Sequence, residues 1–291
     1  MALPSSGPLS LTDIQTEFGG TAPIGLNEYY RGGAYVTPNN TNVPTSGQIA
    51  VNNFYGAVRR ITVPLSISSP AYNYDVYSNR GPSYIAGISD VTLTVDSGVL
   101  VGSTSTAAYA MLVPGSFSPG DTVTIVNNGV IEGMGGNGGD AIYSTFNPGG
   151  NPGFGAGNAL YVNTPVTIQN NSVIAGGGGG GGGASGYRPN KGSDGWGGGG
   201  GGGAGFNAGT GGAGPYGGSP GDSTNGGAGG VGDVGLTGGY GGGRGANGAA
   251  GDPFTGANPR PGGAGGAAGY YLNGNPFVTW SATGTRQGPS I

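Results

Sequence analysis

Residues 176–203 read GGGGGGGGASGYRPNKGSDGWGGGGGGG, in which two unbroken glycine runs, Gly176–Gly183 and Gly197–Gly203, enclose a short mixed segment. Glycine makes up 45 of the 93 residues from 176 to 268. Such a segment has almost no side chains for a core, and glycine loses more backbone freedom on ordering than any other residue. The segment is therefore either a loose tether or a body in which main chains pack directly on one another.

Further along, glycine recurs at every third residue, at positions 226, 229, 232, 235, 238 and 241, and then at 242, 245, 248 and 251. A polyproline-II helix has three residues per turn, so this period lines one edge of such a helix with glycine. Unbroken runs suit a helix that is enclosed on every side. The pattern favours a polyglycine-II bundle over residues 176–268, held by backbone hydrogen bonds. A flexible linker and a collagen-like triple helix are the alternatives.

The composition excludes several classes of protein. Charged residues make up 8% of the chain, the formal net charge is −4, and there is no histidine or cysteine. The chain therefore offers no basic stripe for nucleic acid, no His–Cys metal site, no Ser-His-Asp triad and no disulfide. No stretch approaches the roughly 20 apolar residues of a membrane span. The acids form no motif for a catalytic pair, so we expect no enzyme activity, no cofactor and no metal.

Three similar motifs occur near the start of the chain: LSLTDI at 9–14, IGLNEY at 24–29 and IAVNNF at 49–54. Each has a capping-type residue (Thr12, Asn27 or Asn52) and is followed by a glycine, which is typical of short capped helical turns. The motifs predict a compact helical-turn module over residues 1–58. We expect one group of its side chains to form local core and docking surface: Phe18, Tyr29, Tyr30, Arg31, Phe54 and Tyr55.

Beyond residue 60 the period changes to that of strands. Residues 61–67 and 91–95 alternate apolar and polar side chains. A longer unit recurs at 95–102, 126–133 and 169–176, each copy reading as a strand, a polar turn and a second strand. This predicts a domain of stacked β rungs, like a β-helix or solenoid, over 59–175. Residues 269–291 return to the same pattern and complete it, so the glycine block is inserted between β segments.

The residues that interrupt the glycine block carry the candidate binding side chains. Stiff aromatic and small polar residues at the turns of a rigid platform resemble an antibody paratope in their physics. The alternative is that these aromatics cap the ends of the bundle and shield its backbone. The candidates are Tyr187, Arg188, Lys191, Trp196, Phe206, Tyr216, Tyr240, Arg244, Phe254 and Arg260.

The combined pattern resembles a bacteriophage tail-fibre family. The resemblance rests on residues 9–14 (LSLTDI) and 28–33 (EYYRGG), on FYGA at 54–57, NNG at 127–129 and VTWSATGTR at 278–286. The glycine block is similar to the polyglycine-II domain of the long-tail-fibre adhesins of T-even-like phages. The resemblance implies an adhesin on the virion tail fibre, reaching the cell exterior by lysis. It also implies partners: other tail or virion proteins for the N-terminal module, and a host outer-membrane protein or surface glycan for the loops.

The sequence leaves other interpretations open. The chain could be a non-adhesive structural virion protein, such as a head fibre or tail connector. A polyglycine-II ice-binding protein and a glycan depolymerase are weaker alternatives, because the interruptions are irregular and no acid pair is fixed. Tail fibres are often trimeric, yet a glycine bundle folds within one chain. Both a homotrimer and a single subunit on a trimeric partner fit.

Overall fold

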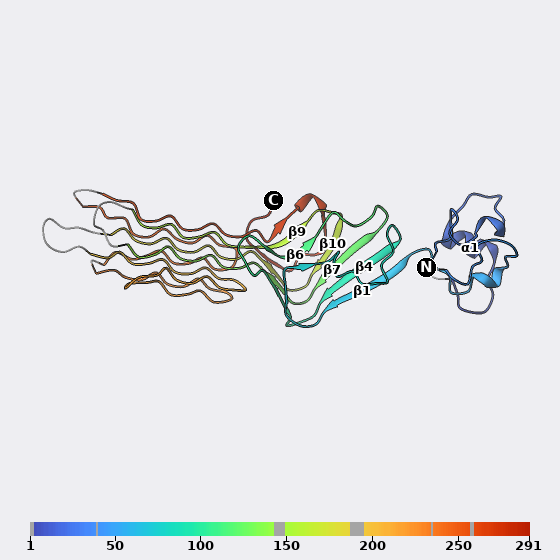
Figure 1. The fold of residues 1–291 in the computed structure, drawn as a ribbon, viewed down its shortest axis with the longest axis horizontal. Coiled ribbons are helices and arrows are strands. Elements are labelled where there is room, and N and C mark those ends of the chain that lie inside the picture. Colours follow the sequence, from blue (N-terminus) through green and yellow to red (C-terminus); the bar gives the residue numbers. More distant parts are fainter. Residues whose placement is uncertain (1–2, 39, 143–148, 187–194, 234, 257–258) are drawn as a thin grey trace. The chain divides into compact units, whose positions relative to one another are not determined.

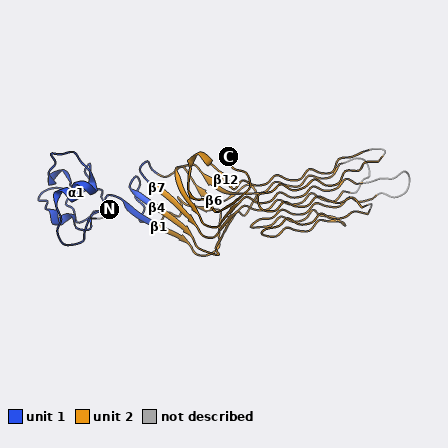
Figure 2. Cartoon of the chain, turned by 180° about the vertical axis from the view of Figure 1, so that it is seen from behind, with its two compact units in different colours: residues 1–63, 82–90, 118–121 blue, residues 64–81, 91–117, 122–291 orange. Residues whose placement is uncertain are grey.

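The computed structural model describes residues 3–38, 40–142, 149–186, 195–233, 235–256 and 259–291 (Figure 1). In this described part the chain is mostly β, its strands form parallel pairs, and the one α-helix is α1 (Leu11–Phe18). This confirms the predicted mostly-β fold. The chain divides into two compact units, coloured in Figure 2, which are considered separately here: residues 1–63, 82–90 and 118–121, and the remainder.

The first unit begins with three short helices: α1, η1 (Leu26–Glu28) and η2 (Val51–Phe54). Each is capped by the side chain at its third position, which accepts the backbone N–H of the residue before the helix. The distances are 2.8 Å for Asp13, 3.0 Å for Glu28 and 2.8 Å for Asn53. The helical turns are therefore confirmed, but the predicted caps Thr12, Asn27 and Asn52 are wrong. They occupy the second helical position, where they do not reach the N-cap N–H.

An aromatic core holds these helices together. Phe18, Tyr29 and Phe54 are each at most 2% exposed, and their ring centroids lie 6.2–6.4 Å apart. The Tyr29 hydroxyl donates to the carbonyl of Gly19 at 2.8 Å, so its one polar group is satisfied where it is buried. Ile14 and Val36 complete the same cluster. This core thus holds the three helical turns together.

The strands form three sheets that the chain visits in turn. The first sheet has the order β1 (Ile61–Ile67), β4 (Ser89–Val95), β7 (Thr122–Asn127), β10 (Val166–Asn170) and β13 (Val278–Ala282). The second has the order β14 (Thr285–Gln287), β11 (Val173–Ala175), β8 (Val130–Glu132), β5 (Leu100–Gly102) and β2 (Ala71–Tyr72). The third has the order β12 (Leu272–Asn273), β9 (Asn158–Val162), β6 (Tyr109–Val113) and β3 (Tyr74–Asp75), and η3 (Asn275–Phe277) precedes β13.

The strand register follows the sequence repeat in part. Val126 pairs with Gln169 and Val130 with Val173, as the repeated unit predicts. Between the first two copies the register differs by one residue, because Leu100, and not Val99, pairs with Val130. The turn at 96–99, in which the Val99 N–H donates to the Asp96 carbonyl, is longer than the corresponding turn at 128–129 of the second copy.

The glycine-rich residues lie in the second unit as long extended segments that run side by side (Figure 1). The run that starts at Gly176 is buried and donates hydrogen bonds to three neighbouring segments in strict rotation. Positions 177, 180 and 183 donate to Gly157, Phe154 and Asn151; positions 178, 181 and 184 to Ala204, Gly201 and Gly198; positions 179 and 182 to Ala246 and Ala249. These distances are all 2.7–3.0 Å.

The second glycine run behaves in the same way. Positions 197, 200 and 203 donate to Ile142, Gly139 and Gly136; positions 198, 201 and 204 to Leu236, Gly239 and Gly242; positions 199, 202 and 205 to Tyr216, Ser219 and Asp222. A Cβ atom at Gly178 or Gly203 would lie 2.0 or 1.8 Å from a neighbouring carbonyl oxygen. Side chains are therefore excluded from both central runs by backbone on every side.

Candidate functional site

The direction of each glycine-rich segment decides where its turns lie. The chain leaves the second sheet after β8 and β11 and re-enters the third sheet at β9 and β12. At the sheet end, the Phe206 N–H donates to the Gly133 carbonyl at 3.1 Å. At the opposite end, the Gly197 N–H donates to Ile142 at 3.0 Å. We call these the sheet end and the distal end.

The described segments reverse five times at the distal end. The described ends that flank these five connections are residues 142 and 149, 186 and 195, 213 and 217, 231 and 237, and 252 and 261; residues 143–148, 187–194, 234 and 257–258 between them lie outside the described part. The reversals near residues 206, 223 and 244 fall at the sheet end. We call the first group the distal turns. Each central run is hydrogen-bonded to three neighbouring segments in turn. The distal turns of these segments therefore lie at one end of a single body, although they are far apart in the sequence.

Four of the predicted binding residues lie in or beside the distal turns. Tyr216 is 37% exposed, and Trp196 is half-buried. Phe254 and Arg260 pair as an antiparallel bridge, with backbone hydrogen bonds of 2.9 and 2.8 Å. The predicted residues Tyr187, Arg188 and Lys191 lie outside the described residues.

Two of the predicted residues lie at the sheet end instead. The ring of Phe206 lies 5.2 Å from that of Tyr72 and covers Gly102, where a Cβ atom would lie 2.0 Å from the ring. Arg244 donates through Nε and Nη2 to the two carboxylate oxygens of Glu132, at 2.7 and 2.9 Å. The structure therefore gives both side chains internal partners on the ends of β5 and β8. Tyr240 lies between the two ends, on the flank, and is 62% exposed.

The Glu132–Arg244 pair is buried. The Glu132 side chain is fully buried and that of Arg244 is 15% exposed. Burial raises the pKa of Glu132, while the Arg244 guanidinium opposes that rise. The bidentate geometry satisfies both carboxylate oxygens, so the pair fastens a sheet-end turn of the glycine-rich body to the second sheet.

The predicted docking residues of the N-terminal module divide by burial. Phe18, Tyr29 and Phe54 form its core and do not reach the surface. Tyr30, Arg31 and Tyr55 are half-buried at the surface. The Tyr30 and Tyr55 hydroxyls donate to backbone carbonyls of the same module, at Gly47 and Gly7. A docking surface would therefore use the outward parts of these three side chains.

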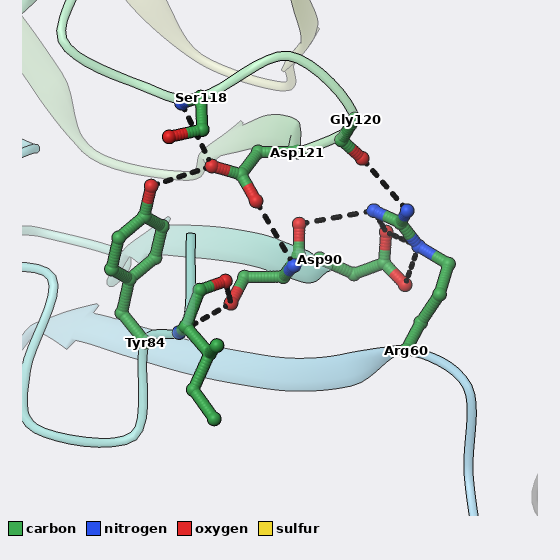
Figure 3. A network of polar contacts seen from close by, with 8 residues as sticks. Arg60, Tyr84, Asp90, Ser118, Gly120 and Asp121 are labelled. Atoms are coloured by element: carbon green, nitrogen blue, oxygen red, sulfur yellow. Dashed lines mark hydrogen bonds and ion pairs between the residues drawn. The ribbon is translucent and has the colours of Figure 1, made fainter. Parts of the chain in front are cut away.

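Sequence reasoning missed a polar network in the first unit, drawn in Figure 3. Arg60 Nε donates to both oxygens of Asp90, at 2.8 and 2.9 Å, and Nη1 donates to the Gly120 carbonyl at 2.7 Å. Asp121 accepts the Tyr84 hydroxyl at 2.5 Å and the backbone N–H groups of Ser89 and Ser118, each at 3.0 Å. The hydrogen bond to Asp90 is the main cause that raises the pKa of Arg60. The network joins loops 82–90 and 118–121 and is a structural element.

Two further features of the described residues bear on function. Among them, three or more His, Cys, Asp or Glu side chains nowhere gather closely enough to hold a metal ion. In the same part of the chain, every helix is too short or too polar to cross a membrane.

Comparisons with known proteins assign the second unit and part of the first to a family. The family model described as phage tail fibre adhesin Gp38 matches residues 60–291. A solved structure, the gp37–gp38 adhesin tip complex of the long tail fibre of bacteriophage S16, is similar to this chain. The identity is 21%, the TM-score is 0.49, and the match covers 99% of this chain and 100% of that chain. No curated protein matches the chain.

Proposed function

The chain belongs to the phage tail fibre adhesin Gp38 family, and on that premise we propose that its distal turns bind a receptor on the surface of the host cell. It is a tail-fibre adhesin, located on the tail fibre of the virion. The observation that carries the proposal is that the described ends of five connections, from residues 142 to 261, lie at one end of a hydrogen-bonded body.

We assign the glycine-rich body to a polyglycine-II bundle and the three sheets to a parallel β-solenoid. The bundle is supported by the rotation of hydrogen-bond donors among three neighbours, which is the geometry of a helix with three residues per turn. The solenoid is supported by the order in which the chain visits the sheets. The proposed functional division is that of the sequence prediction with one change: residues 1–58 attach, residues 59–175 with 269–291 form the base, and residues 176–268 present the turns, but the segments 133–142 and 149–157 also run within the glycine-rich body.

The distal turns suit recognition because their support is rigid. Main-chain hydrogen bonds hold the segments that carry the turns, so few side-chain rotamers need to be ordered on binding. Tyr216, Trp196 and Phe254 supply stiff aromatic surface, and Arg260 supplies a cation. Tyr187, Arg188 and Lys191 remain predicted contacts. The expected receptor is an outer-membrane protein or a surface glycan.

The proposed partner of residues 1–58 is another protein of the tail fibre. Support comes from the compact aromatic core, which gives this module its own fold, and from the family match, which begins only at residue 60. Tyr30, Arg31 and Tyr55 are the proposed contacts. We propose no catalytic role for the chain. A binding experiment with the other fibre proteins would test these contacts, and its stoichiometry would show whether one copy or three assemble.

Adsorption of purified full-length protein to host cells tests the receptor proposal. We expect a variant with Trp196, Tyr216 and Phe254 all changed to Ser to lose adsorption while keeping its thermal stability. Phe154→Ser is the matched control, because Phe154 is 63% exposed on a flank of the same body. Protease or periodate treatment of the cells would tell a protein receptor from a glycan. Equal adsorption of the triple variant and the wild type would refute the assignment and favour a purely structural virion protein.

A further inference from the structure

Three aspartates of the glycine-rich body lie at its distal end, and each accepts a backbone N–H from another segment. Asp140 precedes the first distal turn. Its Oδ1 accepts the N–H of Ala213, at the start of the third distal turn, at 2.8 Å. One side chain therefore connects two turns that are separated by 73 residues in the sequence.

Asp233 connects two turns. It lies in the turn between residues 231 and 237, and its Oδ2 accepts the N–H of Trp196 at 3.4 Å. The same carboxylate is the main cause that raises the pKa of Tyr216, in the third distal turn. Trp196 follows the second distal turn. The carboxylate thus joins the described ends of the second and fourth distal turns.

Asp252 connects the remaining turn. Its Oδ2 accepts the Thr237 N–H at 2.8 Å, and its own N–H donates to the Thr237 carbonyl at 2.9 Å. Its backbone carbonyl accepts the N–H of Ser185, which precedes the second distal turn, at 3.1 Å. The fifth distal turn is thereby joined to the fourth and the second.

We infer that Asp140, Asp233 and Asp252 are positioning residues, each of which holds the described end of one distal turn to that of another. The central glycine runs hold the segments in place but do not hold the turns. The residues of a turn lie beyond the region in which each N–H donates to a neighbouring carbonyl. Carboxylates form stronger hydrogen bonds than neutral acceptors, and each carboxylate here accepts a donor from a different turn. The inference rests on the proposed function, because an ordered surface matters only if the distal turns bind.

The alternative role for these carboxylates is direct contact with the receptor. In that case their oxygens would be expected to point outward without internal donors. Each of the three instead accepts at least one internal hydrogen bond. The two roles differ in what a change to asparagine does, because asparagine keeps one acceptor oxygen but loses the charge.

The test uses the full-length protein with Asp233→Ala, Asp252→Ala and the corresponding changes to Asn. Asp222→Ala is the matched control, because Asp222 lies in a sheet-end turn and accepts the N–H groups of Thr224 and Asn225 within that turn. Two properties are measured: amide hydrogen exchange at Trp196 and Thr237, and adsorption to host cells. For Asp233, the pKa of Tyr216 is also followed by NMR of labelled tyrosine.

We expect Asp233→Ala to speed exchange at Trp196 and Asp252→Ala to speed exchange at Thr237, each about tenfold, the factor that corresponds to one ordinary hydrogen bond. Adsorption should fall by a similar factor, the Asn variants should recover most of both properties, and Asp222→Ala should change neither. The pKa of Tyr216 should fall in both Asp233 variants.

Two results would overturn the inference. Unchanged exchange in the Ala variants would mean that these carboxylates do not order the turns. Loss of adsorption in the Asn variants, with exchange as in the wild type, would make them receptor contacts. If the wild type itself fails to adsorb, the proposed function fails, while the exchange data still decide whether the aspartates order the turns.

Discussion

The exclusion of side chains from the glycine runs leads to a prediction about Gly200, in the middle of the second run. Its N–H donates to Gly139 at 2.8 Å and its carbonyl accepts from Gly212 at 2.8 Å. A Cβ atom on Gly200 would lie 1.9 Å from the carbonyl oxygen of Gly181 and 2.4 Å from its carbonyl carbon. Gly155 offers a matched control on an outer segment, because its Cβ would meet only the Ala267 oxygen, at 3.8 Å.

The magnitude for Gly200→Ala follows from these distances. A carbon and a carbonyl oxygen approach to about 3.3 Å, so two central segments would have to separate by roughly 1.4 Å. Overpacking of this kind costs about 1–3 kcal/mol. A separation of that size also stretches the hydrogen bonds between the segments, and each buried donor left without a partner costs about 1–3 kcal/mol. We expect a loss of about 3–5 kcal/mol for Gly200→Ala, and a change between zero and a gain of about 1 kcal/mol for Gly155→Ala.

Urea unfolding of the two variants, monitored together with amide exchange at residues 176–205, measures this difference. The reasoning would be refuted if Gly200→Ala unfolded within about 0.5 kcal/mol of the wild type, which is the scatter of ordinary surface changes. An equal loss in both variants would also refute it, because the cost would then come from helix or chain propensity and not from the close approach of backbones.

The remaining predictions concern the anchors, the cap and the turns. Arg244→Met should destabilise the protein by about 3–5 kcal/mol in urea unfolding, because it leaves Glu132 buried and unpaired. Adding Glu132→Gln should recover most of that loss. If the losses of the two single variants simply added in the double variant, the reasoning would be contradicted. Asp13→Ala should cost α1 about 1 kcal/mol, seen as faster amide exchange in that helix alone. Phe206→Ala should lower stability by about 3–5 kcal/mol without reducing adsorption of the folded protein, since its ring fills a sheet-end contact. Tyr216→Ala should reduce adsorption without lowering stability. If Phe206→Ala reduced adsorption and Tyr216→Ala lowered stability, the roles assigned to the two residues would be wrong.

Local patterns in the sequence predicted the elements well. The alternation at residues 61–67 and the three capped motifs correspond to a strand and to three short helices. Errors arose where local detail matters: the caps are at the third helical position, and the longer turn at 96–99 accompanies a shifted strand register. In both cases the outcome depends on a hydrogen bond with a backbone group, and the position of that group depends on the geometry of the turn. Similarity between sequence motifs does not reveal this geometry.

The candidate site was predictable in composition and not in arrangement. The sequence shows which residues interrupt the glycine, but not at which end a given reversal falls, because that depends on how many segments precede it and on their long-range pairing. Phe206 and Tyr216 look alike in sequence, yet one packs on β5 and the other lies in a distal turn. The network of Arg60, Asp90 and Asp121 was missed for a similar reason, since its partners are 30 or more residues apart.

Because main-chain hydrogen bonds hold the glycine-rich body together, substitutions in the glycine runs and substitutions in the turns should have different consequences. Within the enclosed runs almost any replacement is damaging, so drift there should be close to nil. Apart from Asp140, Asp233 and Asp252, the distal turns are not constrained in this way, because the segments on either side pair through peptide groups that every residue possesses. New side chains, and even changes of length, can thus accumulate in the distal turns while the scaffold stays the same, so the proposed binding surface can change through replacement of a few short stretches.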